Sequence, residues 1–353
     1  MMSEFMVWNL SDNIKKYNNY REQCVNTTPY HLTEYLLAEA QAEDGITKIF
    51  CYEENGKFAL IPQIVKKIND LPYMSDLKEE MYDMITPHEY GGIIFNSNQQ
   101  YINQKLLEYI LKYCKEKHII FQFIRLNPYM KELPDIYQKA GYHVIHNRNQ
   151  IYVDLRKTEE QIMKEYKSSV RRNIRRSEKE GLVFEIAEKN LKNLADFQRM
   201  YQKAMELLNA RKFLYFNDGY FRALLKCDCC RLGLVRDKNG KSIAASILLL
   251  DSDTAYYHLG CFDREYSLSR PMNYLMHSMI LWSKQEGCKT YHLGGGAASL
   301  MQFKEGYSNT RISYYIAENV CDKDVYNAIC NKWKVLFPQY KDEKYYPLYR
   351  YNE

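Results

Sequence analysis

Two chemical features lie close together in the segment YHLGGGAASLMQFKEGYS, residues 291–308. Three glycines, residues 294–296, follow an apolar run, and glycine lets a backbone approach a ligand because it has no Cβ. Lys304 follows the aromatic Phe303, and a lysine placed there could stabilise charge that develops on a leaving oxygen. The segment predicts either a cleft floor with a catalytic lysine or a glycine-rich surface loop followed by a solvated lysine.

A second feature is the basic segment of residues 158–181, which has helical spacing, acidic residues at its start and Gly181 as its stop. Its four arginines fall on one side of the expected helix, where like charges repel mildly. The segment is therefore either a solvated basic face or a landing surface for a polyanion. The basic residues are Lys164, Lys167, Arg171, Arg172, Arg175, Arg176 and Lys179.

Other catalytic patterns are absent. The chain has no G-x-S-x-G elbow, no H-E-x-x-H, no Walker loop and no dinucleotide-binding glycine loop. Cys227, Cys229 and Cys230 are either part of a metal site or small residues entering a strand, and since no second cysteine pair occurs we predict no metal. His258 and His292 sit in apolar strands, which is typical of buried, hydrogen-bonded histidines.

Helix and strand patterns place these groups in an α/β fold. The first half predicts a helix with Thr28 as cap, a hairpin at an Asn-Gly turn, a longer helix, a buried strand, a short helix and a last strand. These elements cover residues 30–42, 46–68, 98–117, 118–126 and 133–155.

The second half repeats this order, with a hairpin at Gly240, a strand, a helix over residues 270–287 and a short strand that ends in the glycines. We expect Ser269 to cap that helix, and the junction before it is either a general anion site or an ordinary capped helix. The repetition predicts two α/β (α+β) units that arose by internal duplication. No long heptad pattern occurs, so we expect no coiled-coil arm.

The composition is that of a globular protein. Of the 353 residues, 46% are hydrophobic and 26% charged, and the net charge of +5 permits an anionic ligand without demanding a nucleic acid. The 33 tyrosines reflect either compositional drift or tyrosine-lined pockets. No run of 18 apolar residues or secretory signal occurs, and the ten cysteines form no disulfide framework. We therefore expect a cytoplasmic protein with reduced thiols and no transmembrane segment.

Four segments together resemble the FemABX-type aminoacyltransferases, which belong with the GNAT-like N-acyltransferases. They are KSSVRRNIRRSEKEG, YFNDGYFRALL, RPMNYLMHSMILWSKQEGCKTYHLGGG and LMQFKEGYS, and ITPHEYGG (85–92) resembles a motif in the first half of related proteins. The resemblance implies two GNAT-like domains. The second, residues 150–316, would carry the acyl-transfer site and interrupt the first, residues 1–149 and 317–353.

The resemblance also implies transfer of an amino acid from aminoacyl-tRNA to an amine of a peptidoglycan precursor peptide, in cell-wall bridge formation. Phe303 and Lys304 match the family pair at the tRNA acceptor end, where the lysine assists loss of the ribose oxygen. Arg211 is the candidate for precursor phosphates, and His292 stands where the family has an acidic residue. The expected substrate-binding residues are Arg211, Tyr215, His292, Gly294, Gly295, Ser269 and Arg270.

The expected partners are aminoacyl-tRNA and a UDP- or lipid-linked muramyl peptide, with peripheral association at the inner membrane face and no bound cofactor. An acyl-CoA-dependent N-acyltransferase of the same fold is the alternative, and the junction before Pro271 would then replace the missing phosphate loop. A third interpretation is a non-catalytic RNA- or carrier-binding module. The expected tRNA- or polyanion-binding residues are Lys167, Arg171, Arg172, Arg175 and Arg176.

Overall fold

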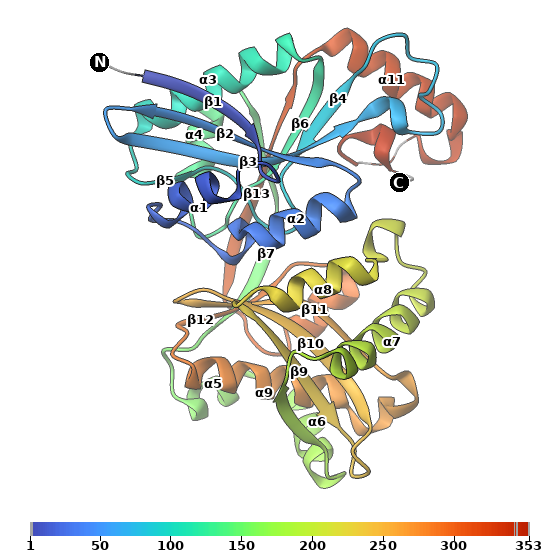
Figure 1. The fold of residues 1–353 in the computed structure, drawn as a ribbon. Coiled ribbons are helices and arrows are strands. Elements are labelled where there is room, and N and C mark those ends of the chain that lie inside the picture. Colours follow the sequence, from blue (N-terminus) through green and yellow to red (C-terminus); the bar gives the residue numbers. More distant parts are fainter. Residues whose placement is uncertain (1–2, 342, 344, 352–353) are drawn as a thin grey trace. The chain divides into compact units, whose positions relative to one another are not determined.

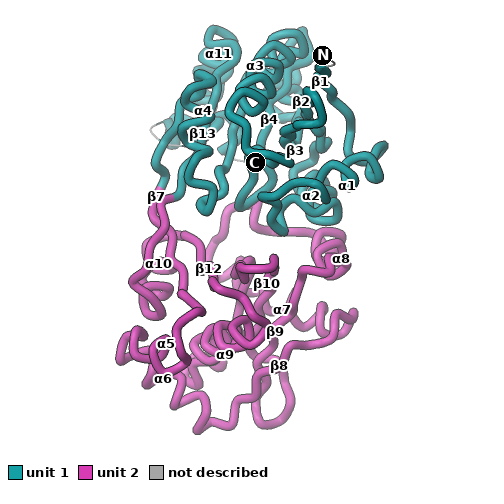
Figure 2. The backbone as a smooth tube through the Cα atoms, turned by 90° about the vertical axis from the view of Figure 1, so that its left-hand side faces the viewer, with its two compact units in different colours: residues 1–147, 314–353 teal, residues 148–313 magenta. Residues whose placement is uncertain are grey.

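The computed structural model describes residues 3–341, 343 and 345–351. The chain divides into two compact units, shown in Figure 2. Unit 1 comprises residues 1–147 and 314–353, and unit 2 comprises residues 148–313. The boundaries expected from the resemblance lie after residues 149 and 316.

Unit 1 is a mixed sheet with helices (Figure 1), in the strand order β1-β2-β3-β4-β6-β13, and β5 pairs with β3. Neighbouring strands are antiparallel except β4 and β6, which are parallel. The strands are β1 (Ser3–Asn9), β2 (Ile46–Glu54), β3 (Lys57–Lys67), β4 (Tyr82–Ile85), β5 (Ile94–Phe95), β6 (Ile119–Arg125) and β13 (Arg311–Val320). The helices are α1 (Ile14–Glu22), α2 (Thr33–Ala42), α3 (Gln100–Glu116), α4 (Leu133–Lys139) and α11 (Lys323–Leu336), with 3₁₀ turns at Pro29–His31, Ile68–Asp70, Pro338–Tyr340 and Leu348–Arg350.

Unit 2 has the strand order β7-β12-β11-β10-β9-β8, and the pair β11–β12 is parallel. The strands are β7 (His143–Asp154), β8 (Val183–Ala187), β9 (Cys230–Arg236), β10 (Ser242–Leu250), β11 (Thr254–Phe262) and β12 (Thr290–Gly294). The helices are α5 (Glu159–Glu165), α6 (Ser168–Lys179), α7 (Leu191–Leu207), α8 (Asp218–Lys226), α9 (Pro271–Gln285) and α10 (Ala298–Lys304), with 3₁₀ turns at Lys212–Leu214 and Arg264–Ser269.

The two units repeat one order of elements, which confirms the predicted duplicated α/β fold. In each unit a strand, two helices and three strands precede a crossover helix, α3 or α9, and unit 1 has the two-residue strand β5 in addition before its helix. The crossover helix joins the two strands of the parallel pair, as such a connection requires. The first repeat ends with β7, whose residues 151–154 belong to unit 2 and pair with β12. The second repeat ends with β13, whose residues 316–320 belong to unit 1 and pair with β6. The strands of the repeats are thus exchanged, which the duplication pattern did not predict.

Helices cover both faces of each sheet. β3 and β10 are buried along nearly their whole lengths, although successive side chains point to opposite faces. Helix α9 and helix α7 both contact β10. The crossover helix α3 shows the sequence cause, because its buried Ile102, Leu106 and Ile110 recur every fourth residue and form one apolar face.

The two predicted hairpins differ in their turns. Asn55 and Gly56 connect β2 and β3 with φ values of +51° and +72°, as a two-residue type I′ turn requires. The second turn is longer, because Asp237 and Lys241 close it by a backbone bond and Gly240 supplies the positive φ of +80°. The Asn-Gly pattern therefore located both turns and gave the length of only the first.

The lengths and hydropathies of the helices bear on two expectations, the absence of a coiled-coil arm and the absence of a transmembrane segment. None of the helices in the described residues exceeds the 17 residues of α3 and α7, so no coiled-coil arm extends from this part of the chain. Over the same residues, no helix combines the length and the apolar composition that crossing a bilayer requires.

Candidate functional site

The glycine segment turns sharply at the end of β12. Gly294 has a φ of +73°, and the register against β7 shifts between His292 and Gly294. A Cβ on Gly295 would lie 2.9 Å from Cδ of Arg148, and Gly296 has a φ of +147°. Only residues without a Cβ fit this close, left-handed turn.

Helix α10 begins directly after the turn and returns Lys304 to it. The ammonium of Lys304 donates a hydrogen bond to the carbonyl of Gly295 and lies 5.5 Å from the ring centroid of Tyr257. Lys304 is only 4% exposed, so the interpretation as a solvated surface lysine is wrong. A buried ammonium needs such contacts with a carbonyl and an aromatic face to offset lost hydration.

Phe303 fixes the other side of α10. Its partly buried ring packs against the unit 2 core, and its centroid lies 5.4 Å from that of Tyr307. The Phe-Lys pair thus has two different roles in the structure: Phe303 anchors the helix to the core, while Lys304 faces the glycine turn.

His292 lies in the middle of the sheet. It is 1% exposed, its register partners are Tyr152 on β7 and Tyr256 on β11, and its ring centroid is 5.6 Å from that of Tyr256. The position where the FemABX-like pattern expects an acid is therefore a buried imidazole among tyrosines.

The junction before α9 differs from the expected cap. Ser269 is the last residue of a 3₁₀ turn, and the N-cap is Arg270, with a φ of +56° and no side-chain cap bond. The expectation that Ser269 caps α9 is wrong, because the left-handed Arg270 takes the cap position. The carbonyls of Ser269 and Arg270 accept from the hydroxyl of Ser177 on α6, at 2.7 and 3.1 Å.

The predicted basic helix is two helices, α5 and α6. The break falls at Tyr166 and Lys167, whose backbones are extended. Tyr166 is buried, and the backbone N–H of Lys167 donates to the carbonyl of Gly306 at 2.8 Å. A Cβ on Gly306 would lie 2.6 Å from Val170, so this glycine lets α6 approach the segment after Lys304.

The predicted polyanion-binding residues divide into two groups. Arg171 donates to the carbonyls of Met163, Lys164 and Tyr166, so its guanidinium caps the end of α5. Arg172, Arg175 and Arg176 are exposed on the side of α6 opposite its buried residues, and Lys167, the N-cap that precedes α6, is exposed as well. These exposed residues, here called the basic face, are Lys167, Arg172, Arg175 and Arg176.

A polar chain that sequence reasoning missed connects α6 to this region. Asn173 donates to Asn273 on α9 at 3.1 Å, and Asn273 donates to the hydroxyl of Tyr307 at 2.9 Å. Tyr307 follows Lys304 by three residues. No sequence motif marks these asparagines, because each has the appearance of an ordinary helix residue.

Arg211 and Tyr215 lie on a separate segment between α7 and α8. Arg211 is the exposed N-cap of a 3₁₀ turn, and Tyr215 is 42% exposed. The segment is anchored by Tyr201, whose hydroxyl donates to the Leu214 carbonyl at 3.0 Å.

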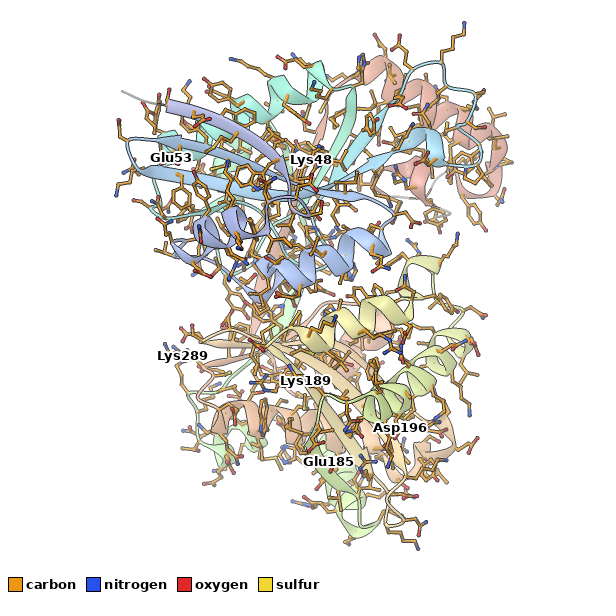
Figure 3. The ribbon with its side chains drawn as sticks, viewed as in Figure 1. Lys48, Glu53, Glu185, Lys189, Asp196 and Lys289 are labelled. Carbon is orange, nitrogen blue, oxygen red and sulfur yellow. The ribbon has the colours of Figure 1, made fainter. Side chains whose placement is uncertain are left out.

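Neither the cysteines nor the groove on the unit 2 surface adds a residue to the candidate site. The thiol of Cys227 beside Cys229 lowers the pKa of Cys229, and no group of three or more His, Cys, Asp or Glu in the described chain is arranged to hold a metal ion. An open groove of about 420 Å³ lies between β8 and α9, lined by Phe184, Glu185, Ile186, Ser278, Leu281, Trp282 and Gln285. None of these is a predicted site residue, and Glu185, labelled in Figure 3 with Asp196, pairs with Arg236 at 2.7 Å.

Comparisons with known proteins bear on this arrangement. Residues 164–305 match the acetyltransferase (GNAT) domain family. A search of curated protein sequences found no match. The solved structure of FemX superposes with a TM-score of 0.68 and 14% identity over 92% of this chain and 99% of FemX.

Two further solved structures are similar. L-PGS from Bacillus licheniformis has a TM-score of 0.59 and 14% identity over 90% of this chain and 95% of its own. The C-terminal domain of a putative lysylphosphatidylglycerol synthetase from Agrobacterium fabrum has a TM-score of 0.59 and 13% identity over 94% and 96%. The expected resemblance is confirmed for the fold: the chain has the two-unit GNAT-like fold of FemX, and its residues 164–305, with the glycine turn and Lys304, match a GNAT acyltransferase domain.

Proposed function

We propose that this chain is an aminoacyltransferase that moves an amino acid from aminoacyl-tRNA to an amine of a peptidoglycan precursor peptide. The observation that carries the proposal is the buried ammonium of Lys304, held between the Gly295 carbonyl and the ring of Tyr257. A hydrogen-bond donor fixed in a site with little water stabilises developing negative charge more strongly than the same donor in water.

The reaction would be an aminolysis. The acceptor amine attacks the ester carbonyl of the aminoacyl group, a C–N bond forms, and the C–O bond to the ribose breaks. The amine loses a proton, and the ribose oxygen leaves as a hydroxyl. Lys304 would donate a hydrogen bond to that oxygen as its charge develops, and positioning of the two substrates would contribute about 7–11 kcal/mol.

The basic face supports a polyanionic donor. Its residues are exposed, and the backbone of Lys167 bonds to Gly306, two residues after Lys304. A tRNA bound there would have its phosphates beside the helix that packs on the catalytic segment. Arg211 and Tyr215 remain our candidates for the precursor, and Ser269, Arg270, His292, Gly294 and Gly295 for the substrate channel.

The names of the similar structures agree with aminoacyl transfer, since lysylphosphatidylglycerol synthetase is named for joining lysine to a phospholipid. The match of residues 164–305 to a GNAT acetyltransferase domain favours a second candidate, an N-acyltransferase that uses acyl-CoA. Both functions would place the acyl group at the same part of unit 2, so the identity of the donor separates them.

A donor screen tests the proposal. Labelled aminoacyl-tRNAs and acyl-CoAs are each offered with UDP-linked and lipid-linked muramyl peptides, and products are identified by mass spectrometry. We expect an aminoacylated peptide from a charged tRNA. Transfer from acyl-CoA alone would establish the second candidate, and salt-dependent RNA binding without transfer from any donor would establish a binding module.

A further inference from the structure

The strand under Lys304 contains a β-bulge. In the pairing of β10 with β11, Ile247 lies opposite Leu259 and the next residue, Leu248, lies opposite Tyr257. His258 is therefore an extra residue on β11. A bulge of this kind redirects side chains and is often found beside functional sites.

The bulge brings Tyr257 and Gly260 to the same side of the strand. Residues three positions apart point to opposite faces of a regular strand, and the extra residue cancels this difference. The ring lies across the glycine, because a Cβ on Gly260 would meet the Tyr257 hydroxyl at 2.2 Å and its Cζ at 2.8 Å. Gly260 thus leaves the space that this position of the ring requires.

The bulge residue is itself anchored. His258 is 6% exposed, and its Nε2 lies 3.0 Å from the hydroxyl of the buried Tyr220 on α8. The ring of Tyr220 stacks on Phe216 with centroids 4.0 Å apart. The strand therefore cannot slide to a regular register without breaking a buried contact with α8.

The result is an aromatic surface beneath Lys304, whose Nζ lies 5.5 Å from the Tyr257 ring centroid. This distance is within the 6 Å range in which a ring face attracts a cation. We propose that Tyr257 is a positioning residue that holds the Lys304 ammonium against its ring face, and that the bulge and Gly260 exist to place this ring. The inference deepens the proposed function and rests on it, because it concerns the same lysine.

The ring and not the hydroxyl does the positioning. Burial raises the pKa of Tyr257 far above its ordinary value, so the phenol stays neutral and does not act as a base. Phenylalanine offers a similar ring face, whereas leucine fills the space without a π-system. Tyr257→Phe and Tyr257→Leu therefore separate the two parts of the side chain.

The test combines kinetics with an NMR signal that needs no activity. We expect Tyr257→Leu to lower kcat roughly 2- to 30-fold with little change in KM. We expect Tyr257→Phe to retain most of the wild-type kcat. In ¹⁵N-lysine protein, the Lys304 ammonium signal is identified by its loss in Lys304→Met. We expect the ring to shift its protons upfield in the wild type and in Tyr257→Phe, and the shift to disappear in Tyr257→Leu.

Two further variants keep the test decisive. Gly260→Ala displaces the ring and is expected to reduce the same shift while leaving the tyrosine in place. Tyr101→Leu removes an exposed ring 5.7 Å from Lys105 in unit 1 and is expected to leave the Lys304 signal unchanged. An unchanged signal and kcat in Tyr257→Leu, or an equal loss in Tyr257→Phe, overturns the proposal. Absence of transfer from every donor would reject the proposed function while the NMR result still decides the role of Tyr257.

Discussion

The two units end an equivalent short helix with a lysine, and the two lysines differ. Lys139 ends α4 with 48% of its side chain exposed and pairs with Asp135, one turn earlier on the same helix, at 2.7 Å. Lys304 ends α10 with 4% exposed and contacts the Gly295 carbonyl and the Tyr257 ring. Duplication thus repeated the scaffold, and the surroundings of the helix end decide whether its lysine is a surface charge or a candidate catalytic group.

The connection before each helix accounts for part of this difference. Residues 126–132 join β6 to α4, whereas only residues 295–297 join β12 to α10. The chain can form so short a connection because Gly296, which has no Cβ, adopts a φ of +147°. It brings the end of α10 back to the end of the strand, where Lys304 reaches the Gly295 carbonyl.

Buried charge in unit 1 is instead paired with carboxylates. Arg350 donates to Asp83 at 2.7 Å, and the hydroxyl of Tyr349 donates to the same oxygen at 3.0 Å. Lys66 pairs with Glu43 at 2.7 Å. These contacts connect β3 to the end of α2 and β4 to the segment after α11, which is a structural role.

The largest effect should follow from breaking that structural pair. Arg350→Met leaves Asp83 buried without its cation, and we expect the free energy of unfolding to fall by about 3–5 kcal/mol. Arg156→Met, which removes an exposed partner of Asp154, should change it by less than about 1 kcal/mol. Urea unfolding measures both, and equal small losses would show that the buried pair does not stabilise unit 1.

The comparison of the two lysines is tested next. Lys304→Met should lower kcat for aminoacyl transfer about 100- to 1,000-fold, as loss of one fixed donor to a developing charge does. Lys139→Met should leave the rate unchanged because its ammonium is at the surface. A Lys304→Met protein with a native circular dichroism spectrum and normal transfer would remove Lys304 from the site.

Each unit also contains a buried histidine that makes it sensitive to acid. Burial lowers the pKa of His31 in unit 1 and of His277 in unit 2 to about 4. Well above pH 6.5 both states are neutral, and as the pH falls through 6.5 toward 4 mainly the unfolded state takes up the proton. Stability is therefore lost on acidification, by about 2 kcal/mol per histidine between pH 6.5 and pH 5.

Replacement of one histidine should reduce this loss. His277→Phe keeps an aromatic ring beside Tyr166, and urea unfolding at the two pH values should show about 2 kcal/mol less acid sensitivity than the wild type. An unaltered pH dependence in His277→Phe would show that this imidazole does not carry the effect.

The smallest effect concerns the glycine turn. Gly296→Ala places a Cβ 2.6 Å from Leu300 at a positive φ, so we expect a loss of about 1–3 kcal/mol in stability and a weaker hold on Lys304. In Gly141→Ala, before β7, the added Cβ meets no atom within 4 Å. The stability of this variant should fall by only about 1 kcal/mol, the cost of holding alanine at a φ of +90°. Thermal unfolding compares the two, and equal losses would mean that the Leu300 contact adds nothing.

Local pattern predicted much of the scaffold. The apolar spacing of α3 and α9, the buried runs of β6 and β12, and the Asn-Gly turns are all properties of neighbouring residues. The edge strands β1 and β8 were missed because apolar and polar residues do not alternate along their sequences, SEFMVWN and VFEIA. The order of elements in the two halves sufficed to predict the duplicated fold.

The site depended on contacts that no local pattern contains. The break between α5 and α6 is fixed by Gly306, which lies far along the chain from Lys167. Burial of Lys304 required α10, a helix the sequence analysis did not predict. The bulge at His258 depends on its contact with Tyr220 on another helix. Residue types could therefore suggest Lys304, whereas its surroundings required the three-dimensional structure.

The exchange of β7 and β13 has a consequence for synthesis of the protein on the ribosome. When residues 1–147 have emerged, β6 still lacks its neighbour β13, and Asp83 still lacks Arg350. Unit 2 can close first, because β7 precedes it in the chain. The unit that is started first is therefore completed last, and truncated chains should present an unpaired β6 edge that invites association with other chains.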